Sequence, residues 1–160
     1  MSDFVAGYDR HVLTLGDRLV GHGKPTLFVA EEGQANAGDP MIALRMIQIA
    51  ADAGADAIEF QLAIADDLYV RSHEGHAIYQ GREFDQSELA LLVTTASKLG
   101  IGFVATALSP KLVPTLSELG CTLFNLNSSD LDNPEMIDSV TDTGKPFLIS
   151  TAMALSLIHI

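Results

Sequence analysis

Cysteine and basic residues are scarce in this sequence. The single cysteine, Cys121, cannot form an internal disulfide, and its place in an apolar run predicts a small buried thiol. The chain has 9 lysine and arginine residues against 21 acidic ones, which gives a formal net charge of -12. Because such a surface repels phosphate backbones and anionic lipid headgroups, we expect neither nucleic acid nor membranes as partners.

Long apolar runs are scarce as well, and the first residues do not follow the pattern of a targeting leader. No stretch approaches the roughly 18 apolar residues of a membrane-spanning helix. The start Met-Ser-Asp-Phe-Val does not place basic residues before an apolar segment, so we expect a cytoplasmic protein. The glycine-bounded run 33–38 has the spacing of neither a dinucleotide fingerprint nor a phosphate-binding loop, and it gives no support to nucleotide binding.

Apolar residues are plentiful, and they follow a repeat. Hydrophobic residues make up 48% of the chain and charged residues 19%, which predicts a globular protein with a sizeable core. Short β-rich runs recur, each after an amphipathic helical stretch that stops at a glycine, and this order is typical of βα units with a parallel sheet. The glycines are Gly54, Gly100, Gly120 and Gly144, and the runs that follow them are 57–61, 102–106, 122–127 and 146–151.

These units predict an α/β fold of the parallel (β/α)8 TIM-barrel type, truncated after strand five. A first strand is expected at 26–31. A closed barrel needs about 250 residues, so a chain of 160 residues provides one domain but not a whole barrel. Helices are expected at about 41–53, 85–99, 110–119 and 134–143, and one long connection at 64–84.

Both ends of the chain fall outside this repeat. Residues 12–20 alternate around Gly16-Asp17, which predicts a small hairpin that closes the barrel floor. We therefore divide the chain into an N-terminal floor segment at 1–25, the half barrel at 26–154 and a tail at 155–160. The tail ends in apolar residues without a helix cap, and we interpret it as a truncation scar.

Polar side chains lie at alternate positions near the ends of the expected strands. Residues two apart share one face of a strand, so Glu59 faces the barrel interior while Ile58 and Phe60 face the helices. In such barrels the catalytic groups come from the C-terminal ends of the strands. A hydrogen-bonded interior without a chemical role is the alternative. The inward set comprises Glu31, Glu59, Gln61, Thr106, Asn125, Asn127 and Ser150.

Five segments of the chain carry a pattern that is more specific than the repeat. They are Phe28-Val-Ala-Glu-Glu-Gly-Gln34 with Gly38-Asp39, Ala53-Gly-Ala-Asp-Ala-Ile-Glu-Phe-Gln61, Ile101-Gly-Phe-Val-Ala-Thr106, Phe124-Asn-Leu-Asn-Ser-Ser-Asp-Leu131, and Thr143-Gly-Lys-Pro-Phe-Leu-Ile-Ser-Thr151 with Met153-Ala154. In order and spacing they resemble the sialic acid synthase family over about residues 27–154.

The resemblance implies an enzyme that condenses phosphoenolpyruvate with an N-acetylated amino sugar into a nine-carbon 2-keto acid for surface carbohydrate biosynthesis. It also implies small-molecule substrates and a divalent metal, Mn or Mg, that polarises the sugar aldehyde. Because half a barrel exposes unpaired strand edges and an apolar inner face, we expect a homodimer. In the family the histidines that bind this metal lie beyond strand five. They are therefore absent from this chain, which we expect to be inactive by itself.

The resemblance assigns roles to individual residues. Glu31 and Asp130 match catalytic positions, and Asp130 lies near the sugar. Contacts with phosphoenolpyruvate are implied for Thr106, Ser128 and Ser150.

Further substrate contacts are expected from two other regions. Gln61 belongs to the inward set, and the long connection covers the sugar site in the family, which suggests contact through His76, Tyr79 or Gln80. The pair His73 and His76 is also a candidate for metal binding, although no helix is predicted to fix its geometry.

Two departures from the family concern the anionic substrate. Glu59 and Asn125 stand where the family has lysines, and a glutamate in place of a lysine reverses the charge that faces a phosphate. Compensation by Arg71, Arg82 and Lys111 is one hypothesis. In another, Glu59 and Glu31 form an oxygen-rich site for a divalent or ammonium cation. The alternative function is a divergent, non-synthase homologue that serves as a carbohydrate-binding or assembly subunit.

Overall fold

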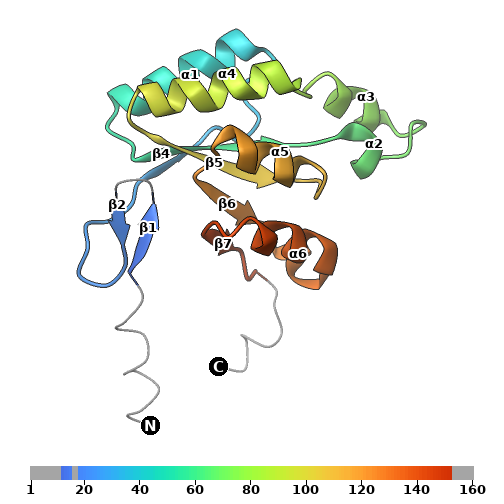
Figure 1. Ribbon diagram of the computed structural model, residues 1–160. Helices are drawn as coiled ribbons and strands as arrows, with labels where there is room; N and C mark the ends of the chain where they lie inside the picture. The colour runs from blue at the N-terminus through green and yellow to red at the C-terminus, as the bar shows by residue number, and fades with distance from the viewer. Residues whose placement is uncertain (1–11, 16–17, 153–160) are drawn as a thin grey trace.

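The computed structural model describes residues 12–15 and 18–152, and its main feature is a curled sheet of five parallel strands (Figure 1). Its strands lie in chain order, β3-β4-β5-β6-β7, so β3 and β7 form the two open edges. This topology confirms the predicted half barrel. The strands are β3 (Val29–Glu31), β4 (Ala57–Leu62), β5 (Gly102–Ala107), β6 (Leu123–Leu126) and β7 (Phe147–Ile149).

Four helices follow the predicted positions and cover one face of this sheet (Figure 1). Asp39 caps the first by accepting hydrogen bonds from the backbone, and Asp85 caps the second in a capping box with Glu88. The predicted glycines follow the helices with positive φ angles, as a C-cap requires. The helices are α1 (Pro40–Asp52), α4 (Gln86–Lys98), α5 (Leu112–Leu119) and α6 (Pro134–Asp142).

Alternation along the strands separates two apolar clusters. On the helix side, Phe60 and Phe103 stack with their ring centroids 5.2 Å apart inside the larger cluster. On the opposite, concave face, Ala57, Val104 and Leu123 form the smaller cluster. The two faces of β4, β5 and β6 are therefore assigned by burial as well as by sequence period.

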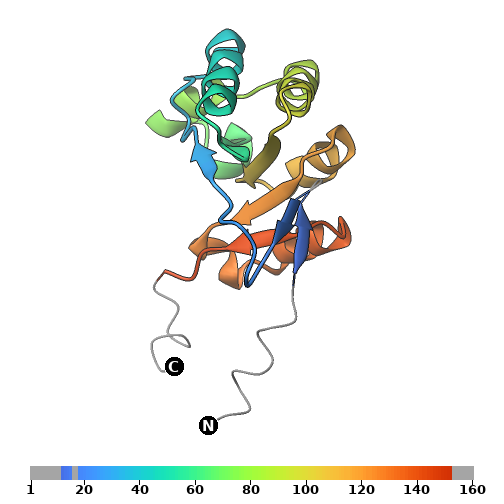
Figure 2. The same cartoon turned by 90° about the vertical axis from the view of Figure 1, so that its left-hand side faces the viewer.

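A hairpin closes the floor of this half barrel, as predicted. It consists of β1 (Leu13–Leu15) and β2 (Arg18–Val20), and Leu15 is buried in the small concave cluster. In Figure 2 the hairpin lies beside the strands while the sheet turns progressively from β3 to β7. The domain boundaries stay a prediction, and the tail at 155–160 lies outside the described residues.

Asp56 connects the hairpin to the segment that precedes β3. Its carboxylate bonds to Arg18 of the hairpin and accepts a hydrogen bond from the Phe28 backbone at 2.8 Å. We expect Asp56→Ala to lower the free energy of unfolding of the full-length protein by about 2 kcal/mol, because a partly buried guanidinium and an amide lose their acceptor. Urea denaturation measures this. Asp138→Asn, on exposed helix surface, is the control, and equal midpoints for the two variants would contradict the role of Asp56.

The long connection between β4 and α4 differs most from the expectation. We call this connection, residues 63–85, the excursion. It contains two short helices, α2 (Ala65–Leu68) and α3 (Glu74–Gln80). A short 3-10 helix, η2 (Ser128–Asp132), also follows β6. Helices this short carry too little periodicity to be predicted from sequence. Within the described residues no helix combines the length and the apolar character needed to cross a membrane.

Candidate functional site

Polar side chains from three neighbouring strands meet on the concave face. The Glu59 carboxylate on β4 accepts two hydrogen bonds at Oε1, from Thr106 Oγ1 on β5 at 2.5 Å and from Asn125 Nδ2 on β6 at 2.7 Å. Thr106 is buried, while Glu59 and Asn125 are half-buried. The structure thus brings three of the predicted site residues into direct contact, with Thr106 and Asn125 near the C-terminal ends of β5 and β6 and Glu59 midway along β4.

A second polar pair lies beside this network, at the β3 edge. Gln61 Nε2 on β4 donates a hydrogen bond to Glu31 Oε1 on β3 at 3.0 Å. Glu31 and Glu59 are partners in the register of the two strands. Two carboxylates therefore lie on adjacent strands, and the Oε2 atom of each has no hydrogen-bond partner among the described residues.

The loop after β3 is organised by a buried carboxylate that the sequence analysis did not identify. Glu32 accepts hydrogen bonds from Asn36 N at 2.5 Å, Asn36 Nδ2 at 2.7 Å and Gln34 N at 3.0 Å. Gln34 and Ala37 have positive φ angles of 67° and 52°, a strained conformation that the surrounding contacts must hold. The loop at the end of β3 is therefore preorganised. In the sequence, the only sign of this contact is that Asn36 follows Glu32 by four residues.

The remaining strand-end residues lie where the barrel geometry predicts them. Asp130 lies in η2, and its carboxylate accepts a hydrogen bond from Asn127 N at 2.9 Å, which fixes the turn after β6. Ser128 opens the same turn, and Ser150 follows β7, where its backbone N donates to Leu126 O at 2.9 Å. No hydrogen bond joins these side chains to Glu59 within the described residues. Their contact with substrate stays a prediction.

Tyr79 and His76 lie in α3 rather than on the concave face. His76 is buried, and its Nε2 lies 2.8 Å from Asp66 Oδ1. The Tyr79 ring packs against Tyr69 with centroids 5.4 Å apart, and the Arg82 guanidinium lies 5.8 Å from the Tyr79 centroid. These contacts hold the excursion together. Contact between Tyr79 and a substrate stays a prediction.

The three basic side chains considered as compensation for the missing lysines already have partners. Each forms a hydrogen bond to a carboxylate or an amide oxygen, at 2.5 to 2.9 Å. Two of these bonds also fix the excursion, because their acceptors lie in α2. The pairs are Arg71 with Asp66, Lys111 with Asp67 and Arg82 with Gln34.

Acid should loosen the excursion. The hydrogen bond from Arg71 holds the pKa of Asp66 far below its usual range, and the hydrogen bond from Lys111 lowers the pKa of Asp67. A carboxylate with a depressed pKa in the folded state contributes stability that is fully present above its unfolded pKa, about 4, and is lost progressively as the pH falls from that value toward the folded pKa. We expect the hydrogen-exchange protection of α3 to decrease from neutral pH to about pH 3.

A double variant isolates the cause of this acid response. With Asp66→Asn and Asp67→Asn together, protection of α3 should already be low at neutral pH and should change little on acidification. Asp138→Asn should respond like the unmodified protein. Protection that is equal at both pH values in the unmodified protein would show that the two carboxylates do not anchor the excursion.

The described residues do not complete a metal site. In residues 12–15 and 18–152 no three histidine, cysteine, aspartate or glutamate side chains gather in a way that could hold a metal ion. His73 Nδ1 accepts a hydrogen bond from Gly75 N at 3.0 Å, while His76 pairs with Asp66, so the two histidines do not converge. The metal that the resemblance implies therefore does not fit the described residues alone.

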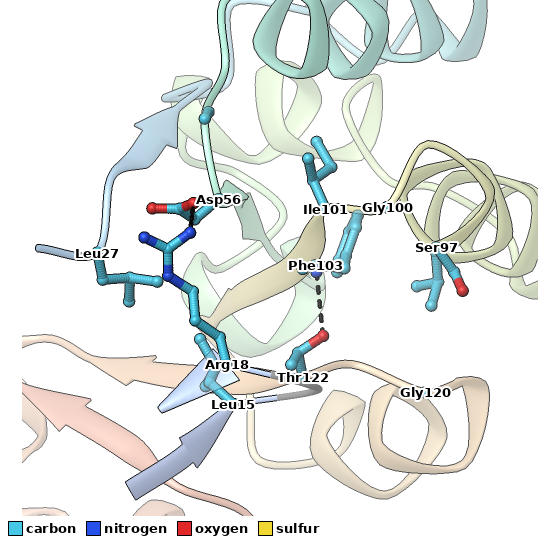
Figure 3. Close-up of a pocket in the computed structure, with 13 residues that line it drawn as sticks. Leu15, Arg18, Leu27, Asp56, Ser97, Gly100, Ile101, Phe103, Gly120 and Thr122 are labelled. Carbon is cyan, nitrogen blue, oxygen red and sulfur yellow. Dashed lines mark hydrogen bonds and ion pairs between the residues drawn. The ribbon is translucent and has the colours of Figure 1, made fainter. Parts of the chain in front are cut away.

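The structure also contains a pocket of about 410 Å³ at the N-terminal ends of the strands. Figure 3 shows Arg18 reaching Asp56 across one side of it, and Thr122, which accepts a hydrogen bond from Phe103 N at 3.2 Å, on another. None of the inward polar residues lines it. Because barrel active sites lie at the opposite, C-terminal ends of the strands, the polar set rather than this pocket is the candidate site.

Comparisons with known proteins bear on the family and the fold of this chain. Residues 46–156 match the model of the NeuB family. The chain is 31% identical to N,N'-diacetyllegionaminic acid synthase of Campylobacter jejuni, covering 82% of this chain and 43% of that protein. It is 30% identical to N-acetylneuraminate-9-phosphate synthase of Mus musculus, covering 85% of this chain and 42% of that protein. The chain thus spans less than half the length of these relatives.

A solved structure gives the same result for the fold. The N-acetylneuraminic acid synthetase of Leptospira borgpetersenii, crystallised with citrate, superposes with a TM-score of 0.85 at 31% sequence identity. The superposition covers 93% of this chain and 53% of that chain. The half barrel described above is therefore similar to about half of that synthetase chain.

Proposed function

Because the chain belongs to the NeuB family, we propose that the full-length protein condenses phosphoenolpyruvate with an N-acetylated amino sugar to a nine-carbon 2-keto acid. Its relatives include synthases of sialic and legionaminic acids. The observation that carries the proposal is the contact of Glu59, midway along β4, with Thr106 and Asn125 near the C-terminal ends of β5 and β6, the ends at which barrel enzymes place their active sites.

Glu31 is the described side chain best placed to exchange a proton with the substrate. When the new carbon-carbon bond forms, the aldehyde oxygen of the sugar must gain a proton. Gln61 fixes one oxygen of the Glu31 carboxylate, and the other oxygen has no partner among the described residues. A divalent metal, Mn²⁺ or Mg²⁺, would polarise the aldehyde, and residues outside the described part would have to bind it.

Product analysis tests the proposed reaction. The full-length protein would be incubated with phosphoenolpyruvate, Mn²⁺ or Mg²⁺, and each of several N-acetylated hexosamines. We expect phosphate release that depends on the sugar, together with a 2-keto acid whose mass equals that of phosphoenolpyruvate, the sugar and one water molecule minus phosphoric acid. Phosphate release without any sugar, or no phosphate with every sugar, would overturn the proposal.

The alternative function has its own support and its own outcome in this experiment. Two carboxylates on the concave face and three basic residues that are already bonded favour a protein that binds a sugar without using phosphoenolpyruvate. Binding of an N-acetylated hexosamine in calorimetry, with no phosphate released, would identify such a carbohydrate-binding subunit.

A further inference from the structure

Charge on the concave face is of one sign. Among the inward polar residues of the described sheet the charged ones are Glu31 and Glu59, and they are neighbours in the β3–β4 register. The basic side chains near these strand ends are bonded to Asp66, Asp67 and Gln34. A phosphate or carboxylate group placed against β4, β5 and β6 would therefore meet two carboxylates, while Arg71 and Lys111 are each paired with an aspartate and Arg82 is hydrogen-bonded to the neutral Gln34 amide.

The hydrogen bonds of Glu59 show what the face can accept instead. Thr106 and Asn125 both donate to Oε1, so the carboxylate is held in one orientation by groups from two further strands. Oε2 has no donor within the described residues, although a carboxylate oxygen is a strong acceptor. A ligand at this position must bring its own O–H or N–H group to satisfy it.

We propose that Glu59 is a specificity-determining residue whose Oε2 accepts a hydrogen bond from a hydroxyl or N–H group of the amino sugar, which places the sugar against β4, β5 and β6. The proposal rests on the proposed function. It assigns the donor-rich, uncharged substrate to the concave face and leaves the anionic substrate to contacts on other elements. Thr106 and Asn125 act as positioning residues, because they orient the carboxylate without serving as the sugar's acceptor.

Glu59→Gln is the sharpest variant with which to test this role. The amide keeps the size of the side chain, and its oxygen can still accept from Thr106 and Asn125. That orientation turns the NH2 group toward the position of Oε2, so an acceptor becomes a donor. Sugar affinity should fall, whereas the affinity for an anion should stay the same or increase.

The experiment measures steady-state kinetics of the full-length protein with each substrate varied in turn. We expect the KM for the N-acetylated hexosamine to rise at least about tenfold, the size of effect for a lost hydrogen bond to a charged group, with the KM for phosphoenolpyruvate within about twofold. Glu118→Gln, an exposed glutamate on α5, is the matched control and should change neither KM. Circular dichroism verifies that both variants are folded.

Three results would overturn the assignment. They are a rise in the KM for phosphoenolpyruvate alone, a change below twofold in both KM values, and a loss of kcat without a change in the KM for the sugar. The last would make Glu59 part of the chemistry rather than of substrate selection.

Binding without turnover separates this inference from the proposed function. If the unmodified protein releases no phosphate with any sugar, the proposed reaction is wrong, and saturation-transfer NMR with N-acetylmannosamine, N-acetylglucosamine and N-acetylgalactosamine still tests Glu59. We expect at least one of these sugars to receive saturation from the unmodified protein and to lose it in Glu59→Gln. No saturation of any sugar, or equal saturation in both proteins, would overturn the inference.

Discussion

Replacing Gly38 by alanine should lower the free energy of unfolding of the full-length protein by about 3 kcal/mol or more, because the new methyl group has no room. A Cβ atom at this position would lie 2.0 Å from the Gly81 carbonyl oxygen and 2.9 Å from Arg82 Cα. Both are backbone atoms, so the loop after β3 or the end of the excursion must move. The left-handed φ of 85° adds to the cost.

Gly54 is the matched control for this prediction. Its φ of 83° is nearly the same, and a Cβ there would meet nothing within 4 Å. Gly54→Ala should therefore cost only about 1 kcal/mol, the conformational penalty alone. Urea denaturation of both variants gives the difference. Equal destabilisation would mean that the contact between Gly38 and Gly81 does not constrain the loop.

The 160-residue chain on its own should associate into dimers or larger particles. On the β7 edge Phe147, Leu148 and Ile149 are 37%, 47% and 38% exposed, and Phe28 just before β3 is 65% exposed. Unpaired strand edges with apolar side chains are templates for pairing with another chain. Light scattering across a concentration series should show a mass above that of the monomer.

One substitution at the edge should reverse this association. Leu148→Lys places a charge on β7, where it opposes edge-to-edge pairing, and should shift the chain toward monomer. Val70→Lys, at an equally apolar position that is 72% exposed in the excursion, should not. A monomeric 160-residue chain at every concentration, or the same shift with both variants, would contradict the role of the open edge.

The sheet and its inward face could be predicted from the sequence because their signals are periodic. In β4, Ile58 and Phe60 alternate with Glu59 and Gln61, and burial on the helix side leaves the polar residues on the concave face. The glycine after each helix predicted where the helix ends and where the next strand begins. Alternation does not show which side chains form hydrogen bonds across strands, so the contacts of Glu59 with Thr106 and Asn125 could not be predicted from it.

The interactions that hold the excursion and the floor could not be predicted, because they join residues far apart in the chain. Asp67 bonds to Lys111 over 44 positions, and Asp56 bonds to Arg18 over 38 positions. In the sequence the pair Asp66-Asp67 resembles a solvated turn, although Asp66 accepts a hydrogen bond from Arg71 and Asp67 accepts one from Lys111. No local pattern identifies such partners before the loops are placed in space.

A crystal structure of the full-length protein with an N-acetylated hexosamine and phosphoenolpyruvate bound tests the central claim most directly. The account predicts the sugar against the concave face of β4, β5 and β6, with one of its O–H or N–H groups within hydrogen-bond distance of Glu59 Oε2, and the phosphate away from these strands. Phosphoenolpyruvate against Glu59, or a sugar bound outside the concave face, would contradict it.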